Sequence, residues 1–395
     1  MIISKKSVVF ILGTAFFIYL SIMMLYTYLP LYLKFLGVPI PIVTLTMTFA
    51  MSTFFIFPPL LGRYSDKLQN RIYFIFIGSV GMLITLIFLL FTNNFIILNI
   101  LLFIFGFFTS SLTIILTLYS ELVQNDQKWI SYYNSICSLG SFIGVLIGGM
   151  MIDIFRVENL FLFILINFML SIIFIVFIRE NRQLILDYNK KVPEYIEKKV
   201  IDNNPEEDNN ISKSIYYSLL FRNFGIIPIL NILVIIMSFY ISSNTEIALL
   251  VGINPLFQFF IMLLLGKILN QKNIKAFMLL GYCLSVIVIV GYIISVDFWG
   301  FLTFQVIVSL SYSMFWMATI VYIAQNSTPI NKGRLMGYAT TSVFAGTTIG
   351  GLFFSLLLTV FHSNYYISML FMIIFPAISI LITAFLFKLP EKKVI

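Results

Sequence analysis

Twelve apolar runs of about 20 residues or more limit the possible fold of this sequence more than any other feature. They lie at residues 8–33, 38–61, 72–91, 95–119, 132–152, 160–178, 223–242, 247–265, 274–294, 298–324, 335–361 and 365–387. Each is long enough to cross the hydrocarbon core of a bilayer as a helix. Hydrophobic residues make up 60% of the chain and charged residues 10%, far from the balance of a water-soluble domain. The sequence therefore predicts an all-α membrane protein with twelve transmembrane helices.

The cationic residues gather on one side of the predicted membrane. If the N-terminus is cytoplasmic, 22 of the 24 lysines and arginines lie in inner segments, and only Lys34 and Arg156 lie outside. Arg222 belongs to the inner group, directly before the seventh run. This bias is typical of cytoplasmic loops. It predicts a multi-pass protein of the cell membrane with both termini in the cytoplasm, and it explains the net charge of +8 without a nucleic-acid partner.

A charged segment at residues 179–213 separates the first six runs from the last six. It contains K-K-V-P-E-Y-I-E-K-K and then D-N-N-P-E-E-D-N-N. Such a segment has too few apolar residues to fold alone, so it is interpreted as a cytoplasmic linker. A regulatory or partner-binding loop is the alternative. The expected organisation is a six-helix half at residues 1–178, the linker, and a second six-helix half at residues 214–395.

Two short patterns recur in corresponding places of these halves. G-R-Y-S-D-K-L-Q-N-R at residues 62–71 is followed 204 residues later by G-K-I-L-N-Q-K-N-I-K at residues 266–275. G-V-L-I-G-G at residues 144–149 is followed 202 residues later by G-T-T-I-G-G at residues 346–351. Two matches at nearly one offset predict a duplication, and hence two pseudo-symmetric six-helix bundles.

The segment at residues 62–71 resembles the cytoplasmic signature between helices two and three of the major facilitator superfamily of secondary transporters. Gly62, Asp66, Lys67 and Arg71 match that signature, and Gln69 stands where the family has a glycine. The resemblance covers the whole chain and implies two halves that alternate access to a central cavity, with no cofactor. For Asp66 it implies a latch that holds the cytoplasmic gate shut. The alternative is a solvated loop charge, worth about 0–1 kcal/mol.

Glycines recur every four residues in the fifth run and again in the eleventh. The set is Gly140, Gly144 and Gly148 with the adjacent Gly149, and Gly346 and Gly350. Residues four apart share a helix face, so these glycines allow another helix to approach closely. In a transporter such contacts between the halves can seal one side of a cavity, whereas ordinary bundle packing is the alternative. The fifth-run pattern is similar to the signature of the exporter branches, with Val145 in place of their proline.

Polar and aromatic residues repeat at helical spacing in several runs. The clearest stripe is in the tenth run: Gln305, Ser309, Tyr312, Trp316 and Thr319. Further candidates for substrate binding are Tyr19 and Tyr26 in the first run, Asn231 in the seventh, and Asn254 and Gln258 beside Pro255 in the eighth. Uncharged hydrogen-bonding groups beside aromatic rings suit a small neutral or amphiphilic organic solute. Helix packing is the alternative for the tenth-run stripe, and a structural kink is the alternative for the eighth.

Ionisable residues are scarce within the runs. None of the sixteen acidic residues lies near the centre of a run, and Glu121 at the cytoplasmic end of the fourth is the best candidate for proton coupling. A gate ion pair is the alternative role for Glu121.

One histidine and two cysteines supply neither a metal cluster nor a nucleophile with its base, so a membrane enzyme is a remote alternative. The expected protein is a monomeric secondary transporter in lipid, with efflux favoured. A facilitator or importer of sugars or other neutral metabolites is the alternative.

Overall fold

The computed structural model describes residues 5–58, 60–61, 64–65, 71–92, 94–123, 127–178, 211–326 and 332–388, and within these ranges every regular element is helical. The elements before residue 179 form the first set: α1 (Lys5–Phe35), α2 (Ile40–Ile56), α4 (Arg71–Leu90), α5 (Phe95–Thr109), η1 (Ser110–Leu112), α6 (Thr113–Leu122), α7 (Gln127–Phe155), η2 (Val157–Asn159) and α8 (Leu160–Val176). The second set is α10 (Ser214–Met237), α11 (Asn244–Ile268), α12 (Ile274–Ile294), α13 (Phe298–Asn326), α14 (Lys332–Val360), α15 (Tyr365–Met372) and α16 (Ile374–Phe385).

The predicted all-α membrane fold is confirmed. Eleven stretches of the described residues are long and apolar enough to cross a membrane, and α2 adds a shorter apolar helix of 17 residues. Large apolar side chains are exposed on the outside of the bundle, among them Ile100, Ile173 and Leu356. In water this surface would be unfavourable, whereas lipid is its natural solvent.

Several ends and breaks follow from local chemistry. Helix α2 ends at Ile56, five residues before the predicted end, because Pro58 has no backbone N–H with which to continue the helical hydrogen bonds. The predicted fourth run is α5 and α6 joined by the 3₁₀ turn η1, rather than one continuous α-helix. Ser110 in that turn donates to the carbonyl oxygens of Gly106 and Thr53, at 2.9 and 3.1 Å. Such bonds from a hydroxyl to the backbone compete with helical geometry.

The seventh predicted run begins too late. Helix α10 begins at Ser214, nine residues before the predicted start, and so includes Arg222 as its ninth residue. The prediction treated Arg222 as a cytoplasmic flanking charge, but Ile215 and Leu219 before it are fully buried and continue the helix. With Arg222 counted as part of the helix, 21 of the 24 lysines and arginines remain in the segments predicted to be cytoplasmic.

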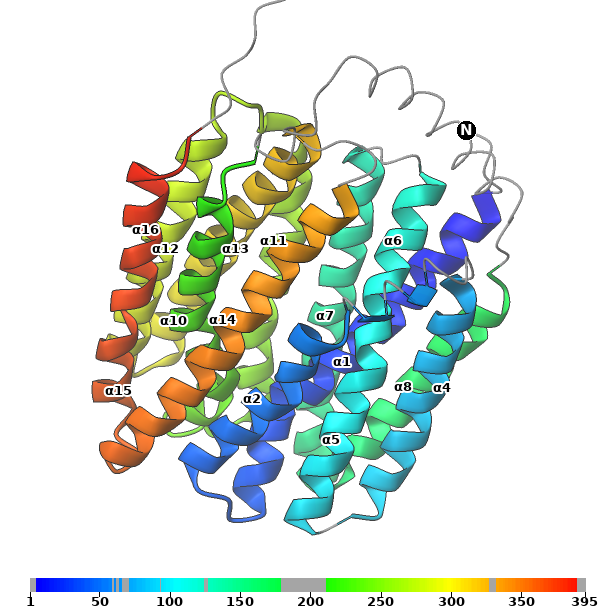
Figure 1. The fold of residues 1–395 in the computed structure, drawn as a ribbon. Helices are drawn as coiled ribbons and strands as arrows, with labels where there is room; N and C mark the ends of the chain where they lie inside the picture. The colour runs from blue at the N-terminus through cyan, green and yellow to red at the C-terminus, as the bar shows by residue number, and fades with distance from the viewer. Residues whose placement is uncertain are drawn as a thin grey trace, which may run out of the picture.

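All the long helices run between two ends of one bundle (Figure 1). The terminal end carries the start of α1 and the end of α16, and the distal end carries the turns after α1, α10 and α14. Figure 1 shows α2 beside α14 and α7 beside α11, and both pairs are in contact. These two helix pairs are the most extensive contacts between the first and second sets.

Candidate functional site

The predicted stripe on α13 is only partly accessible. Gln305, Ser309 and Thr319 are buried, whereas Tyr312 and Trp316 are half-buried. The hydroxyls of Ser309 and Thr319 donate to carbonyl oxygens of their own helix, at 2.6 and 2.8 Å. The rings of Tyr312 and Trp316 are stacked, with centroids 6.1 Å apart and an interplanar angle of 19°. The stripe therefore offers a solute an aromatic platform rather than a row of free hydroxyls.

Helix α1 brings Tyr19 toward this platform. Tyr19 is half-buried, and its phenol lies within electrostatic range of Tyr312 on α13 and of Cys137 on α7. The two tyrosines belong to different helix sets, so this interaction crosses the junction between the sets. Tyr26, two turns further along α1, is buried beside Phe54, and its hydroxyl has no hydrogen-bond partner among the described residues.

Amides occupy two further predicted positions. The amide nitrogen of Asn231 on α10 lies 3.4 Å from the sulfur of Met51 on α2, a weak contact between the two sets. On α11, Gln258 donates to the side-chain oxygen of Asn254 at 2.7 Å. Helix α11 continues through the buried Pro255, so this pair lies on an intact helix.

Arg222 is a buried cation that the sequence analysis placed outside the membrane. Its side chain is fully buried, and it lies eight residues, roughly 12 Å, from the start of α10. Its Nε donates to the hydroxyl of Ser285 on α12 at 3.1 Å, and its Nη1 donates to the side-chain oxygen of Asn223 at 3.1 Å. Its Nη2 has no hydrogen-bond partner among the described residues.

The guanidinium of Arg222 also contacts the aromatic residues of α13. Its central carbon lies 4.4 Å from the ring centroid of Phe315 and 5.9 Å from that of Tyr312. Both distances are within the range of cation–π interactions. Arg222 therefore lies beside Tyr312, one of the two rings of the aromatic platform. The apolar spacing of Ile215 and Leu219 upstream was the sequence signal for its position.

The glycine faces pack helices within each set. A Cβ at Gly144 would overlap the carbonyl oxygen of Leu20 on α1, and a Cβ at Gly346 would overlap that of Leu220 on α10. The other glycines on these faces meet the same two helices: Gly140, Gly148 and Gly350. Of the two expected roles, contact between the halves and ordinary bundle packing, these five glycines show the second, and the contact between halves is wrong for them.

One glycine on each of the same two helices does reach the other set. Gly149 on α7 faces Ala248 on α11, and Gly351 on α14 faces Thr48 on α2. The two contacts correspond to each other in the sequence repeat. The glycine-rich helix α7 of the first set meets α11, and its counterpart α14 of the second set meets α2. Such approaches bring the backbones close together.

Polar contacts join the two sets at the distal end. Lys34 on α1 donates to the hydroxyl of Ser238 at 3.0 Å, and its amine lies 4.5 Å from the ring centroid of Phe239. Ser355 on α14 donates to the carbonyl oxygen of Pro41 at 2.8 Å. These bonds fasten both sets at the end away from the chain termini.

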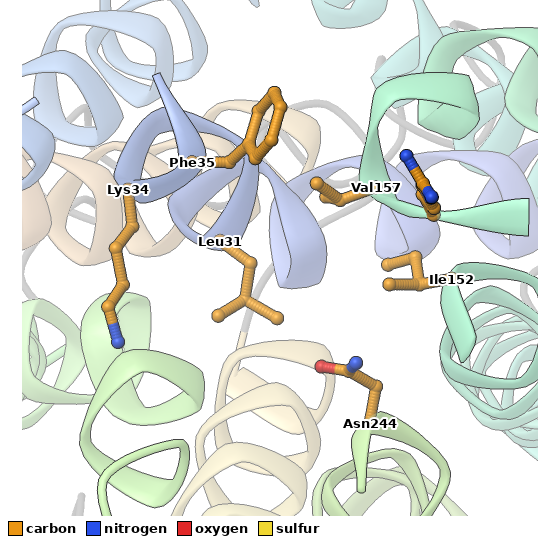
Figure 2. Close-up of a pocket in the computed structure, with 7 residues that line it drawn as sticks. Leu31, Lys34, Phe35, Ile152, Val157 and Asn244 are labelled. Carbon is orange, nitrogen blue, oxygen red and sulfur yellow. The ribbon is translucent and has the colours of Figure 1, made fainter. Parts of the chain in front are cut away.

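A pocket of about 420 Å³ lies beside this distal contact (Figure 2). Its lining residues are Leu31, Lys34, Phe35, Ile152, Arg156, Val157 and Asn244. None of the predicted substrate-binding residues lines this pocket. It is separate from the junction between Tyr19 and Tyr312, and we do not assign the solute to it.

Several predicted gating residues lie outside the described residues: Gly62, Asp66 and Lys67. Arg71 is the first residue of α4, and Glu121 lies in α6, but the side chain of Glu121 is not among those described. In the second copy of the loop, Asn270 accepts hydrogen bonds from the backbone N–H groups of Lys272 and Asn273, at 3.0 and 3.2 Å. The residue at the position of Asp66 in the repeat therefore shapes the turn before α12.

Comparison with known proteins gives one family. A family model described as Major Facilitator Superfamily matches residues 11–242 and again residues 214–394. No curated protein sequence matches the chain.

Solved structures of transporters share the fold at low sequence identity. The nucleoside transporter NupG has a TM-score of 0.71 at 14% identity, over 97% of this chain and 100% of its own. A POT family transporter in complex with 5-aminolevulinic acid has a TM-score of 0.71 at 14% identity, over 96% and 93%. The human organic anion transporter MFSD10 has a TM-score of 0.68 at 13% identity, over 96% and 99%.

Proposed function

Because this chain belongs to the Major Facilitator Superfamily, and is therefore a membrane transporter and not an enzyme, we propose that it moves a small organic solute by alternating access. The solute is neutral or amphiphilic and binds between the two six-helix halves, residues 1–178 and 214–395. Residues 179–213 are the cytoplasmic linker between them. The terminal end faces the cytoplasm, in accord with the cation bias of the sequence.

The half-buried aromatic residues on both sides of the junction, Tyr19 in the first half and the Tyr312–Trp316 pair in the second, carry this proposal. These aromatic residues are half-buried in a part of the bundle where most neighbours are fully buried. They come from α1 and α13, on either side of the junction between the two halves. A solute between them would contact both halves, so its binding would respond to a change in their separation.

The helix pairs α2 with α14 and α7 with α11 support a rocking motion. Each pair runs along the junction, and each contains a glycine that lets the helices approach, Gly351 or Gly149. When these helices slide past each other, glycine moves against the small side chains Ala248 and Thr48, so few large side chains have to repack. The distal polar contacts of Lys34 and Ser355 would break as the distal end opens.

Efflux is the direction that we favour, since the glycines of α7 follow the exporter-like spacing. Protons are the candidate coupling ion, with Glu121 as the residue that would carry them. The structural relatives include a nucleoside transporter and an organic anion transporter, so their common fold does not select a solute. Facilitated or inward transport of sugars or other neutral metabolites is the second candidate.

Transport in sealed vesicles tests this function. The purified protein, reconstituted in liposomes, is given a panel of radiolabelled solutes, including sugars, nucleosides and aromatic amphiphiles. Flux is read in both directions with and without an imposed pH gradient. Saturable flux of one chemical class is the expected result. Absence of saturable flux for every class and both gradients would contradict the proposal.

A further inference from the structure

We propose that Arg222 is an anion subsite, so that the transported solute is an amphiphile with a carboxylate or similar anionic group that binds Nη2 of Arg222. This inference rests on the proposed function and narrows its substrate class. Nη2 of Arg222 donates a hydrogen bond to the anionic group, and the Tyr312–Trp316 pair contacts the apolar part of the solute.

No carboxylate that the structure describes lies near enough to Arg222 to be its counter-charge. A cation in the membrane interior is costly unless an anion or several acceptors compensate it. The acidic side chains that the structure describes all lie toward the distal end: Asp153, Glu158, Glu246 and Asp297. Arg222 lies fifteen residues before the distal end of α10, a rise of roughly 22 Å, so these carboxylates are too distant to pair with it.

The guanidinium of Arg222 has one nitrogen donor that makes no hydrogen bond with a described residue. The two hydrogen bonds that the guanidinium makes with described residues both go to neutral groups, the hydroxyl of Ser285 and the amide of Asn223. Ser285 in turn shares a hydrogen bond with Ser311 at 2.8 Å, which fixes its position between α12 and α13. Nη2 has no partner in the part of the chain that the structure describes, and a guanidinium binds a carboxylate oxygen far better than it binds a neutral acceptor.

The side chain of Arg222 extends from α10 toward α12 and α13. Leu220 and Phe224, two residues on either side, turn their backbone toward Gly346 and Gly350 on α14. Residues two apart on a helix differ by about 200°, so Arg222 points away from α14 and into the space between α10, α12 and α13. There its guanidinium lies 5.9 Å from the centroid of the half-buried Tyr312 ring. An anionic group bound to Nη2 would therefore lie near the Tyr312 ring.

A purely structural role is the competing explanation. In that case Arg222 joins α10 to α12 through Ser285, and any neutral ligand would bind as well as its anionic analogue. Charge discrimination in binding therefore separates the two explanations, because a structural strut has no reason to distinguish a carboxylate from the corresponding amide.

The test is equilibrium binding to the full-length protein in detergent, measured by titration calorimetry. The probes are 3-phenylpropionate, the isosteric 3-phenylpropionamide and inorganic phosphate. We expect the wild type to bind the carboxylate about tenfold or more tightly than the amide, the size expected for one charge-assisted hydrogen bond. Equal affinity for the two organic probes, or binding of neither, would overturn the inference. So would a response to inorganic phosphate alone, since a bound inorganic anion would then be the counter-charge.

Two variants test whether Arg222 causes the preference for the carboxylate over the amide. Arg222→Gln keeps neutral hydrogen-bonding groups and should reduce the carboxylate preference to within about twofold. Lys272→Gln removes an exposed cation from the turn after α11 and should keep the full preference. Arg222→Gln protein that keeps the full preference would contradict the assignment. If Arg222→Gln does not fold, the wild-type preference for carboxylate over amide decides alone.

The binding experiment and the transport experiment can fail independently of each other. Saturable flux of neutral solutes by a protein that binds no carboxylate would support the proposed function and reject the anion subsite. Selective carboxylate binding without flux under any gradient would support the subsite and reject transport.

Discussion

Asp153 at the distal end of α7 accepts two hydrogen bonds from Thr245 at the start of α11, from the backbone nitrogen at 2.7 Å and from the hydroxyl at 2.6 Å. The same carboxylate accepts from the backbone and side-chain nitrogens of Asn244, at 3.1 and 2.8 Å. A carboxylate from one helix set thus occupies the N-terminus of a helix in the other set, where the exposed N–H groups and the helix dipole favour negative charge.

Replacement of Asp153 by alanine should loosen the distal contact. We expect a loss of about 1 kcal/mol of stability, the usual size for a partly exposed charge at a helix N-terminus. Labelling of a cysteine introduced as Ser243→Cys should also become faster from the distal side. Glu158→Ala is the matched control, since Glu158 is an exposed acid on the neighbouring turn η2. A melting temperature and a labelling rate equal to those of the control would show that Asp153 does not hold the two sets together.

Alanine substitutions at two glycines of α14 should have opposite effects on stability. At Gly346 a Cβ would overlap the carbonyl oxygen of Leu220, whereas at Gly337 nothing lies within 4 Å of the added carbon. We expect Gly346→Ala to cost about 1–3 kcal/mol through overpacking. Gly337→Ala should be neutral or stabilising, by up to about 1 kcal/mol, because alanine favours the helix. Thermal unfolding in one detergent measures both, and an equal response of the two variants would refute the close contact of α14 with α10.

Asp66 permits a test between a charged latch and a turn cap. Asn270, its counterpart in the repeat, is uncharged and caps its turn by accepting two backbone hydrogen bonds. If the charge of Asp66 holds the cytoplasmic gate, both Asp66→Asn and Asp66→Ala should raise cytoplasmic labelling of a cysteine introduced as Ser131→Cys. If Asp66 is a cap, only Asp66→Ala should do so, because asparagine keeps the accepting oxygen. We expect the latch pattern, and unchanged labelling in Asp66→Asn would reject it.

Trp316→Ala should change solute selectivity without loss of folded protein. Removal of one ring from the stacked pair with Tyr312 should raise KM roughly five- to tenfold for aromatic solutes, the equivalent of about 1–1.5 kcal/mol. Trp299→Ala is the control, because Trp299 is 70% exposed at the distal end of the same helix. Transport kinetics in vesicles measure the effect. If Trp316→Ala and Trp299→Ala have the same KM as the wild type, the aromatic platform is not part of the solute site.

The helix count was predictable from the sequence because bilayer thickness fixes the length of an apolar helix. The start of α10 was not, since a charge beside an apolar run normally marks the membrane boundary, and Arg222 is instead buried by contacts with α12 and α13. Only the tertiary structure supplies those contacts. The break at η1 was missed because its hydroxyls bond backbone carbonyls, a local choice that hydropathy does not record.

The site was predictable in its residue types more than in its contacts. Periodicity places Gln305, Ser309 and Tyr312 on one helix face, but it cannot tell that two of these are buried and one is half-buried. Likewise the glycine spacing identified a packing face without identifying the helix that packs there. Gly144 meets α1 of its own set, whereas the neighbouring Gly149 meets α11 of the other.

Glu121→Gln should separate proton coupling from solute movement. Glutamine keeps the size and hydrogen-bonding groups of glutamate but cannot release a proton. We expect accumulation driven by a pH gradient to be lost, while exchange of labelled for unlabelled solute across the vesicle membrane continues, because exchange needs no net proton movement. Glu158→Gln, at the distal end, should keep both activities. Loss of exchange together with accumulation would instead assign Glu121 to a gate ion pair, and full retention of gradient-driven accumulation would exclude it as the proton carrier.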